Sequence, residues 1–294
     1  MVLALLPCEA WAQVAELGQV GVEYQPGSQI GADPRQEIRV LLAHLSVQAP
    51  VPIATWMVLL PGASYELLDF GSRGVDVPRL DTLHDLTLSL GTAIVVSDRI
   101  VAVASVGGGY AAEGFATDDL LLTFSAVGTY AVSDTLRLGA GVAYDGQTGS
   151  ILPIPLVSLE LKLSHRTRLR GLVPTLLVFE HRAADWLTAG VVGSLNGNRY
   201  HLDPAKYHSQ DPELAYAVYS VAPRLSFSFT PALHADIYAG IAVFRRFEVF
   251  ENRASVGANS LKPGAAGGLR LWVGLEGWDA PRSHEDAGRS GALR

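Results

Sequence analysis

The sequence lacks any uninterrupted apolar run of about 18 residues, the length that a membrane-spanning helix requires. Charged residues are scarce, at 17% of the 294 residues against about 25% in typical proteins. No stretch shows the amphipathic helical pattern expected of a soluble domain of this size. A net charge of −7 without a basic stripe excludes nucleic acid as an expected partner. The chain is apolar on average but never apolar for long, as the wall of a β-barrel must be.

Cysteine is nearly absent, and the single Cys8 lies in a segment with the features of a secretory signal. Val2 to Leu6 form a short apolar core, and Ala10-Trp11-Ala12 matches the small-x-small pattern that precedes cleavage before Gln13. The usual basic segment before the core is missing, as in a signal truncated at its start. Cleavage would remove Cys8 and leave a chain without thiols, which suits an oxidising compartment.

Where hydrophobic residues do occur, they alternate with small or polar ones. Leu86, Leu88 and Leu90 are interleaved with Thr87 and Ser89, and the same period of two recurs in residues 136–145 and almost to the C-terminus. Successive side chains of a β-strand point to opposite faces, so each segment has one apolar and one polar face. Segments of this kind, long enough to cross a bilayer, predict an all-β fold, an antiparallel transmembrane β-barrel.

The expected strands number between twelve and fourteen. They are 17–25, 36–48, 54–70, 83–96, 99–112, 119–132, 135–146, 152–164, 167–181, 186–199, 214–229, 233–247 and 267–278. An odd total of thirteen conflicts with the even number of bacterial barrels, and Pro174 interrupts 167–181. A tight reversal at Pro174 would give fourteen strands, whereas loss of this hairpin from the wall would give twelve. The expected organisation is a signal peptide at 1–12, a barrel at 13–278 and a disordered tail at 279–294.

The expected turns alternate between short and long, which is typical of barrels with short periplasmic turns and longer external loops. The short turns are at 96–99, 132–135, 164–167 and 230–232, and the long connections are 25–36, 71–82, 113–118, 199–213 and 250–267. Aromatic residues near strand ends suit the two membrane interfaces: Tyr24, Tyr65, Phe70, Tyr110, Tyr130, Tyr144, Trp186, Tyr200, Tyr219 and Trp278.

The alternation also predicts which way each side chain points. Five apolar residues are expected to face lipid: Leu88, Leu138, Leu161, Ile237 and Leu271. The lumen-facing polar candidates are Arg137, Glu160, Lys162, Arg224, His234, Asp236, Arg270 and Glu276. The same pattern places inside the lumen Glu37, Arg39, Arg168, Arg170, Arg245 and Arg246. Ala242 is also assigned to the inner face, where an arginine would be tolerated if the lumen is hydrated there.

Catalytic and metal-binding motifs are missing from the sequence. None of the eight histidines forms a His-Glu-x-x-His pair, and no Gly-x-Ser-x-Gly occurs. His234 and Asp236 stand two apart on one strand, and a lumenal hydrogen-bond network accounts for them without catalysis. One long loop carries polar side chains that we interpret as solvated rather than metal-binding: His201, Asp203, Lys206, His208 and Asp211. We therefore expect no catalytic residue, no metal and no cofactor.

With the signal, the Ser97-Asp98 and Ser133-Asp134 turns, the alternating walls and the Leu-Val-Pro at 172–174, the chain resembles porin-like outer-membrane β-barrels of Gram-negative bacteria whose function is unknown. The resemblance covers about residues 17–278. It implies export through the periplasm to the bacterial outer membrane. The implied partners are outer-membrane lipid, the barrel-assembly machinery and periplasmic chaperones.

The expected function is that of a narrow pore or a structural barrel, not an enzyme. Two alternatives stay open at this point. One is an outer-membrane enzyme acting on lipid or peptide, for which the candidate residues are His84, Asp85, His234 and Asp236. The other is a soluble periplasmic β-barrel that binds an apolar ligand, which would require the apolar faces to point inward.

Overall fold

The computed structural model describes most of the chain between residues 16 and 274. The described ranges are 16–30, 33–73, 82–113, 121–145, 153–207, 211–251 and 254–274. The expected signal at 1–12, the expected tail at 279–294 and the candidate Glu276 lie outside the described residues. Within these ranges no helix is long and apolar enough to cross a membrane; the one described helix is the short α2 (Pro204–Tyr207).

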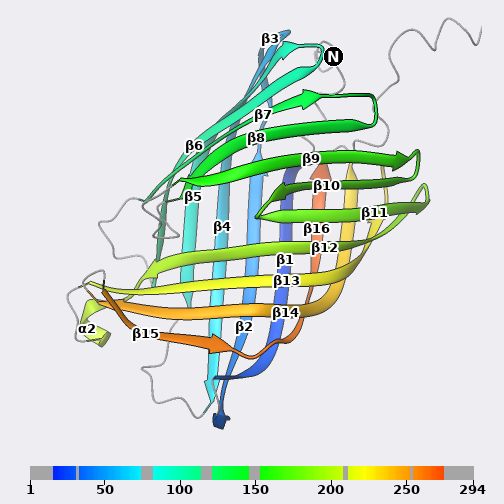
Figure 1. The fold of residues 1–294 in the computed structure, drawn as a ribbon. Coiled ribbons are helices and arrows are strands. Elements are labelled where there is room, and N and C mark those ends of the chain that lie inside the picture. Colours follow the sequence, from blue (N-terminus) through cyan, green and yellow to red (C-terminus); the bar gives the residue numbers. More distant parts are fainter. Residues whose placement is uncertain are drawn as a thin grey trace, which may run out of the picture.

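The described residues form one sheet of sixteen strands (Figure 1). The strands are β1 (Glu16–Ile30), β2 (Asp33–Gln48), β3 (Val51–Ala54), β4 (Met57–Arg73), β5 (Leu83–Ser97), β6 (Ile100–Glu113), β7 (Leu121–Ala131), β8 (Leu136–Asp145), β9 (Ile154–Ser164), β10 (Thr167–Val173), β11 (Leu176–Ala184), β12 (Leu187–His201), β13 (Pro212–Ser228), β14 (Leu233–Glu251), β15 (Ala254–Leu261) and β16 (Gly264–Gly274). Around the sheet each strand is antiparallel to its neighbours along the ring.

The sheet closes on itself into a barrel. β13 pairs with β14, β14 with β16, and β16 with β1, so the ends of the strand order are joined. β3 pairs only with β4, and β15 lies between β14 and β1, which leaves fourteen strands in the ring. The expected closed antiparallel barrel is therefore confirmed.

Pro174 marks the reversal that decides the strand count. β10 ends at Val173 and β11 begins at Leu176, and the Thr175 N–H donates to the Leu172 carbonyl across the turn at 2.8 Å. Both strands belong to the ring, with β10 paired to β9 and β11 to β12. The count is thus fourteen, and the twelve-strand alternative is wrong.

Two expected long connections are wrong, because the chain there continues as strand. The segment 25–36 is almost entirely β1 and β2, and a register shift between Gln25 and Ser28 absorbs Pro26 and Gly27. The segment 250–267 contains β15, which returns along β14 from Ala254 to Leu261. The expected strand 54–70 corresponds to β4, which begins only after the turn at 55–56, and Ala54 instead ends the short β3.

The two ends of the barrel differ. The end that we call the turn end carries the start of β1, the end of β16 and the short turns at 98–99, 132–135, 165–166, 185–186 and 229–232. The opposite end, which we call the α2 end, carries α2 and the longer connections (Figure 1). Strands β7 to β11 stop short of this end, and β12 there meets β6 directly, with His201 paired to Ala112. The barrel therefore narrows toward the α2 end.

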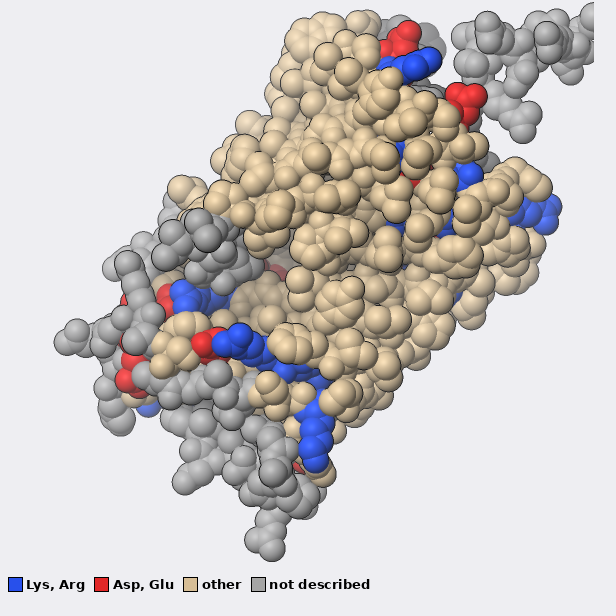
Figure 2. All heavy atoms as spheres, viewed as in Figure 1, with Lys and Arg blue, Asp and Glu red and all other residues tan. Residues whose placement is uncertain are grey.

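Over most of its height the barrel is apolar outside and polar inside. Leu88, Leu138, Ile237 and Leu271 expose 62%, 42%, 50% and 42% of their surface, whereas Asp236, between such residues, exposes 1%. Leu161 lies on the same outer face and is half-buried. Figure 2 shows a broad uncharged band on the visible face, with most Lys, Arg, Asp and Glu side chains toward the two ends. The outward direction expected for these five residues is confirmed.

Near the α2 end this polarity is inverted. Ile38 and Val40 are buried inside the barrel, so the intervening Arg39 points outward and is exposed. On β14 a register shift follows Ala242, after which Arg245 is buried inside while Arg246 points outward. The inward assignments of Glu37, Arg39 and Arg246 are therefore wrong. Because that pattern is typical of strands surrounded by water, this end of the barrel is built like a soluble protein.

Two strand glycines give a test of the register. A Cβ atom at Gly240 would lie 2.1 Å from the Val221 carbonyl oxygen, whereas one at Gly128 would meet no heavy atom within 4 Å. We expect Gly240→Ala to lower the free energy of unfolding by about 1–3 kcal/mol, because backbone atoms cannot move aside. Gly128→Ala should change it by less than about 0.5 kcal/mol. Urea titration of the refolded protein measures both, and equal midpoints would contradict the pairing of β13 with β14.

Candidate functional site

In a closed barrel the lumen is the space that could hold a ligand or pass a solute. At the α2 end of this barrel, side chains fill the lumen. A cluster of side chains from nine strands and the β12–α2 connection, which we call the apolar plug, occupies it: Ile38, Val40, Leu68, Phe70, Leu83, Ala111, Tyr200, Leu202, Leu214, Tyr216, Val218, Ala242, Phe247, Leu261 and Ala266. Phe70, Tyr216 and Phe247 meet edge to face, with ring centroids 4.9 to 5.7 Å apart. Ala242 is on the inner face as expected, but it is fully buried in this cluster, so the condition of a hydrated lumen is not met there. Two of the residues assigned to a membrane interface, Phe70 and Tyr200, are inside the plug, so that assignment is wrong.

At the edge of the plug, side-chain hydrogen bonds join strands that are not paired with each other. Asn198 Nδ2 on β12 donates to Asp85 Oδ2 on β5 at 2.5 Å. Tyr200 on the same strand donates to Glu66 Oε1 on β4 at 3.1 Å. Because β12 lies beside β6 at this end, with His201 paired to Ala112, the first bond crosses β6 alone and the second crosses β5 and β6. These bonds hold β12 against β4 and β5 where β7 to β11 have ended.

A buried polar layer lies beside these hydrogen bonds. Gln25 exposes 2% of its surface and accepts hydrogen bonds from Tyr216 at 2.8 Å and from Arg245 Nη1 at 3.1 Å. Its own amide donates to Glu23 Oε1 at 2.9 Å, and Tyr238 donates to the other oxygen of Glu23 at 3.0 Å. Every member therefore has a partner, as a buried polar network requires.

In the half nearer the turn end the lumen holds a network of ion pairs. Glu180, 1% exposed, accepts from Arg168, from Arg170 at 3.0 Å and from Arg224 at 2.6 Å. Arg224 also lies 3.7 Å from Asp236 Oδ2. We call these residues, together with Arg270, the lumenal charge network. It ties β10, β11, β13, β14 and β16 to one another across the inner face.

Arg270 completes this network from β16. Its Nε and Nη2 donate to Asp236 Oδ2 at 3.0 and 2.5 Å, and its Nη1 donates to Gln19 Oε1 at 3.3 Å. Hydrogen bonds between guanidinium and carboxylate groups in a poorly solvated interior are among the strongest in proteins. Two carboxylates face four arginines here, so they neutralise only part of the positive charge on this face.

The structure places the sequence candidates as follows. Arg224, Asp236 and Arg270 belong to the lumenal charge network. Arg137 on β8 and Glu160 on β9 are cross-strand neighbours, and Lys162 on β9 is the cross-strand neighbour of Arg168 on β10. Arg137, Glu160 and Lys162 therefore lie on the same inner face as the network. Sequence reasoning missed Glu180, because the merged strand 167–181 hid the alternation of Glu180 with the outward Phe179.

His234 and Asp236 share the inner face but have different partners. His234 Nδ1 is hydrogen-bonded to Ser228 Oγ at 3.0 Å, and its ring stacks on Trp272 at 4.0 Å between centroids. Asp236 is instead held by Arg270. Because His234 exposes only 1% of its surface, a substrate has no access to its ring.

The side chains of the other candidate pair, His84 and Asp85, point to opposite faces of the sheet. His84 points outward, where its Nδ1 is hydrogen-bonded to Tyr65 at 2.7 Å. Asp85 points inward to Asn198. Neighbouring residues of a strand cannot act on one substrate from opposite faces of a sheet.

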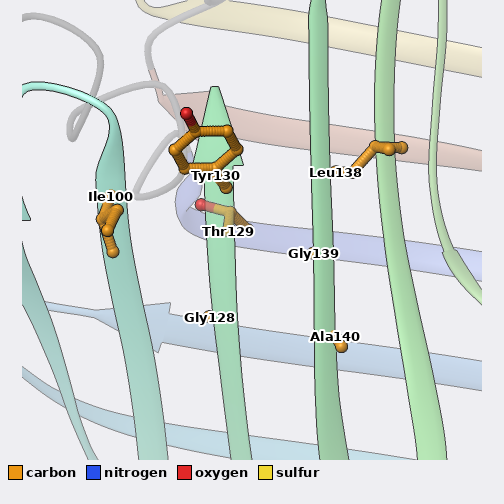
Figure 3. Close-up of a pocket in the computed structure, with 7 residues that line it drawn as sticks. All are labelled: Ile100, Gly128, Thr129, Tyr130, Leu138, Gly139 and Ala140. Carbon is orange, nitrogen blue, oxygen red and sulfur yellow. The ribbon is translucent and has the colours of Figure 1, made fainter. Parts of the chain in front are cut away.

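A depression of about 430 Å³ lies on the outer face, toward the turn end of β6, β7 and β8 (Figure 3). It is lined by Ile100, Gly128, Thr129, Tyr130, Leu138, Gly139 and Ala140. Because Tyr130 and Leu138 point away from the lumen and the lining is almost wholly apolar, it belongs to the outer wall and not to the lumen.

Comparison with known proteins identifies a family. A model described as a domain of unknown function, DUF6268, matches residues 53–275. No match was found among curated proteins.

Several solved structures are similar in fold. The NanC porin is 10% identical, with a TM-score of 0.40, over 88% of this chain and 100% of that one. A FadL homologue of Pseudomonas aeruginosa is 12% identical, with a TM-score of 0.40, over 91% of each chain. A mutant porin of Rh. blastica is 8% identical, with a TM-score of 0.27, over 88% and 98%. At these identities and scores the likenesses carry no functional argument.

Glu180 is the residue on which the lumenal charge network depends. We expect Glu180→Gln to lower the free energy of unfolding by about 3–5 kcal/mol, because Arg168 and Arg224 would be left buried without their carboxylate. Asp185→Asn, at an acidic residue whose side chain is 98% exposed in the turn that follows β11, is the matched control and should leave stability nearly unchanged. Urea midpoints of the refolded proteins measure the difference, and equal effects would show that the network contributes nothing.

Proposed function

We propose that this chain, which belongs to the DUF6268 family, is an outer-membrane β-barrel whose lumen is closed, a structural barrel rather than an open pore or an enzyme. The single observation that carries the proposal is the apolar plug, which fills the lumen at the α2 end with side chains from nine strands.

The membrane location is supported by the polarity of the wall. Outward residues of β14 from 235 to 243 are apolar, a length that suits the about 9–11 residues of a transmembrane strand. Exposed aromatics lie at both limits of this band: Tyr24, Tyr219 and Phe244 toward the α2 end, and Tyr130, Trp186 and Phe229 toward the turn end. A soluble barrel that binds an apolar ligand would need the opposite arrangement along this band. That alternative is set aside.

The orientation follows from the connections. Short turns are typical of the periplasmic side, so the turn end faces the periplasm and the inverted α2 end projects outside the cell. Export with cleavage after Ala12 and assembly by the barrel-assembly machinery with periplasmic chaperones are part of the proposal. Outer-membrane lipid would contact the apolar band.

The absence of a catalytic role is also proposed on physical grounds. His234 is buried against Trp272, Asp236 is neutralised by Arg270, and His84 and Asp85 are on opposite faces. General acid–base catalysis needs such groups within reach of a common substrate. The alternative of an outer-membrane enzyme therefore has no set of residues to support it within the described ranges.

A narrow pore is the second candidate, and the turn half of the lumen favours it. Along β8, β9 and β10 the inner face carries Arg137, Lys162, Arg168 and Arg170 against Glu160. Lys162 is exposed, and the Arg170 side chain is 44% exposed, so water reaches this part of the lumen. If the plug were displaced, the resulting path would favour anions.

Arginine substitutions test the membrane band. We expect Ile237→Arg to reduce barrel stability by about 2–4 kcal/mol, because its side chain would lie in hydrocarbon. Asn196→Arg is the matched control: Asn196 lies on the inner face, paired with Val218, yet is exposed to water. Unfolding of both variants in lipid vesicles measures the effect, and equal tolerance would refute the membrane band.

Conductance in planar bilayers tests the closed lumen. The unaltered protein should show no steady conductance, whereas the double variant Phe70→Ala, Phe247→Ala should conduct with a preference for chloride over potassium. Phe244→Ala is the control, because this aromatic is on β14 but points outward and is 51% exposed. Steady conductance of the unaltered protein would replace the structural barrel with the pore.

A further inference from the structure

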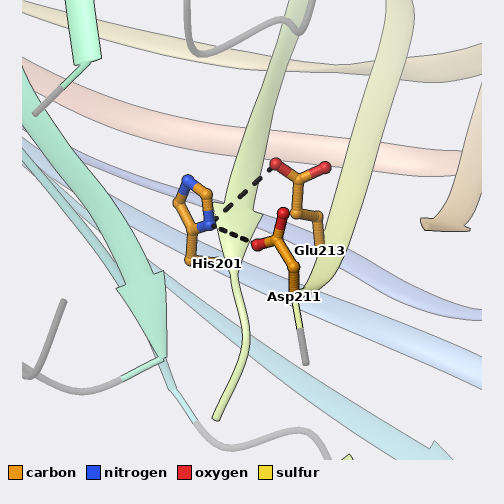
Figure 4. A group of neighbouring side chains, drawn as sticks. All are labelled: His201, Asp211 and Glu213. Atoms are coloured by element: carbon orange, nitrogen blue, oxygen red, sulfur yellow. Dashed lines mark ion pairs between the residues drawn. The ribbon is translucent and has the colours of Figure 1, made fainter. Parts of the chain in front are cut away.

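We propose that the outer face at the α2 end holds a divalent transition-metal cation between His201, Asp211 and Glu213 (Figure 4). The site lies outside the lumen, so it does not depend on whether the lumen conducts. It replaces our expectation, drawn from the sequence, that the chain has no metal site.

The three side chains converge from the two strands that flank α2. His201 is the last residue of β12, Glu213 is the second residue of β13, and Asp211 directly precedes β13. Each offers one ligand atom, and these atoms all lie within 4.8 Å of one another. His201 Nδ1 is 3.7 Å from Asp211 Oδ1 and 3.9 Å from Glu213 Oε1. Figure 4 shows the two carboxylates turned toward the same ring nitrogen.

These separations are close to those that a metal imposes. Bonds of about 2.0–2.2 Å from zinc to nitrogen and oxygen place neighbouring tetrahedral ligands about 3.3–3.6 Å apart. The two distances from His201 Nδ1 would have to shorten by a few tenths of an ångström, and the two carboxylate oxygens, which lie within 4.8 Å of one another, by up to roughly 1 Å. One imidazole and two carboxylates suit zinc and similar transition metals, and the remaining coordination position would be filled by water.

The backbone already holds the ligands in place. His201 and Glu213 are direct cross-strand partners at the end of the β12–β13 ladder. The ladder extends one step further, with the Leu202 N–H donating to the Pro212 carbonyl at 2.8 Å. A cation would therefore find a site whose ligands lose little conformational freedom on binding.

The local charge also favours a cation. Glu213 is about nine-tenths buried, and its Oε2 lies 3.3 Å from Arg199 Nη1 but accepts no hydrogen bond among the described residues. Its Oε1 is the oxygen that faces His201. With Arg199 opposite Glu213, the negative charge of Asp211 is left for the ion. Coordination through Oε1 would give this buried carboxylate a partner besides Arg199.

The other polar residues of this segment have separate partners. Lys206 Nζ donates to Glu113 Oε1 at 2.6 Å, and the Asp203 N–H donates to Glu113 Oε2 at 3.3 Å. His208 lies outside the described residues. The sequence-based interpretation of a solvated loop did not include Glu213, the ligand that the β12–β13 pairing brings to His201.

Zinc titration of the full chain, refolded in detergent micelles, tests the proposal. Isothermal titration with ZnCl₂ should give one site per chain, and His201→Gln and Asp211→Asn should each weaken binding at least tenfold. His165→Gln, in an exposed turn at the other end of the barrel, is the matched control and should bind as the unaltered chain does. Replacing zinc by Co²⁺ should give visible absorption bands that disappear in the His201→Gln variant.

Several results would overturn the proposal. These are no zinc binding at 100-fold excess over protein, binding that survives both substitutions, or binding lost equally in the His165 control. If His201→Gln fails to refold, Asp211→Asn decides alone, because Asp211 lies outside the strands and is partly exposed.

Discussion

Closure of the backbone hydrogen bonds around a ring is the constraint on which this structure depends. Every strand of the ring has a neighbour on each side, from β1 through β14 and β16 back to β1. Hydrocarbon offers no partner for an amide, so a sheet that contacts lipid must close. The pairing register then decides which residues face outward, since a slip of one residue would exchange the two faces. The apolar exterior and the charged interior are two consequences of the same pairing.

The buried carboxylates are tolerable because arginines within the ring surround each of them. Glu180 and Asp236 would each be costly in isolation, yet four arginines from β10, β13 and β16 surround them. Fixing those guanidinium groups also fixes the spacing of the strands that carry them. The network contributes to the shape of the barrel more than to its stability, because burying ion pairs recovers little net free energy.

Much of the fold was predictable from the sequence because the alternation of apolar and polar residues with a period of two is visible among neighbouring residues. The Leu86–Ser89 alternation and the reversal at Pro174 both follow from neighbouring residues alone. The predictions were wrong where residues distant in the sequence decide the local structure. Pro26 and Gly27 indicate a loop until β2 is seen to accommodate them in a bulge, and Arg246 points outward only because of a register shift between β13 and β14. Glu37 and Arg39 were misassigned because the apolar plug, built from nine strands, inverts the polarity of β2 there. Glu213 likewise joins His201 only through strand pairing.

The hydrogen bonds that close the narrow end impose an order on assembly. Asn198 bonds to a residue 113 positions earlier in the chain, and Tyr200 to one 134 positions earlier. No part of the chain before β12 can supply these partners, and the apolar plug further requires β13 to β16. The side chains of β2, β4 and β5 that fill the narrow end therefore stay without their final contacts until about two thirds of the strands have been added to the sheet. Contacts of such sequence separation make folding slow. A barrel filled in this way becomes stable only after its last strands have paired.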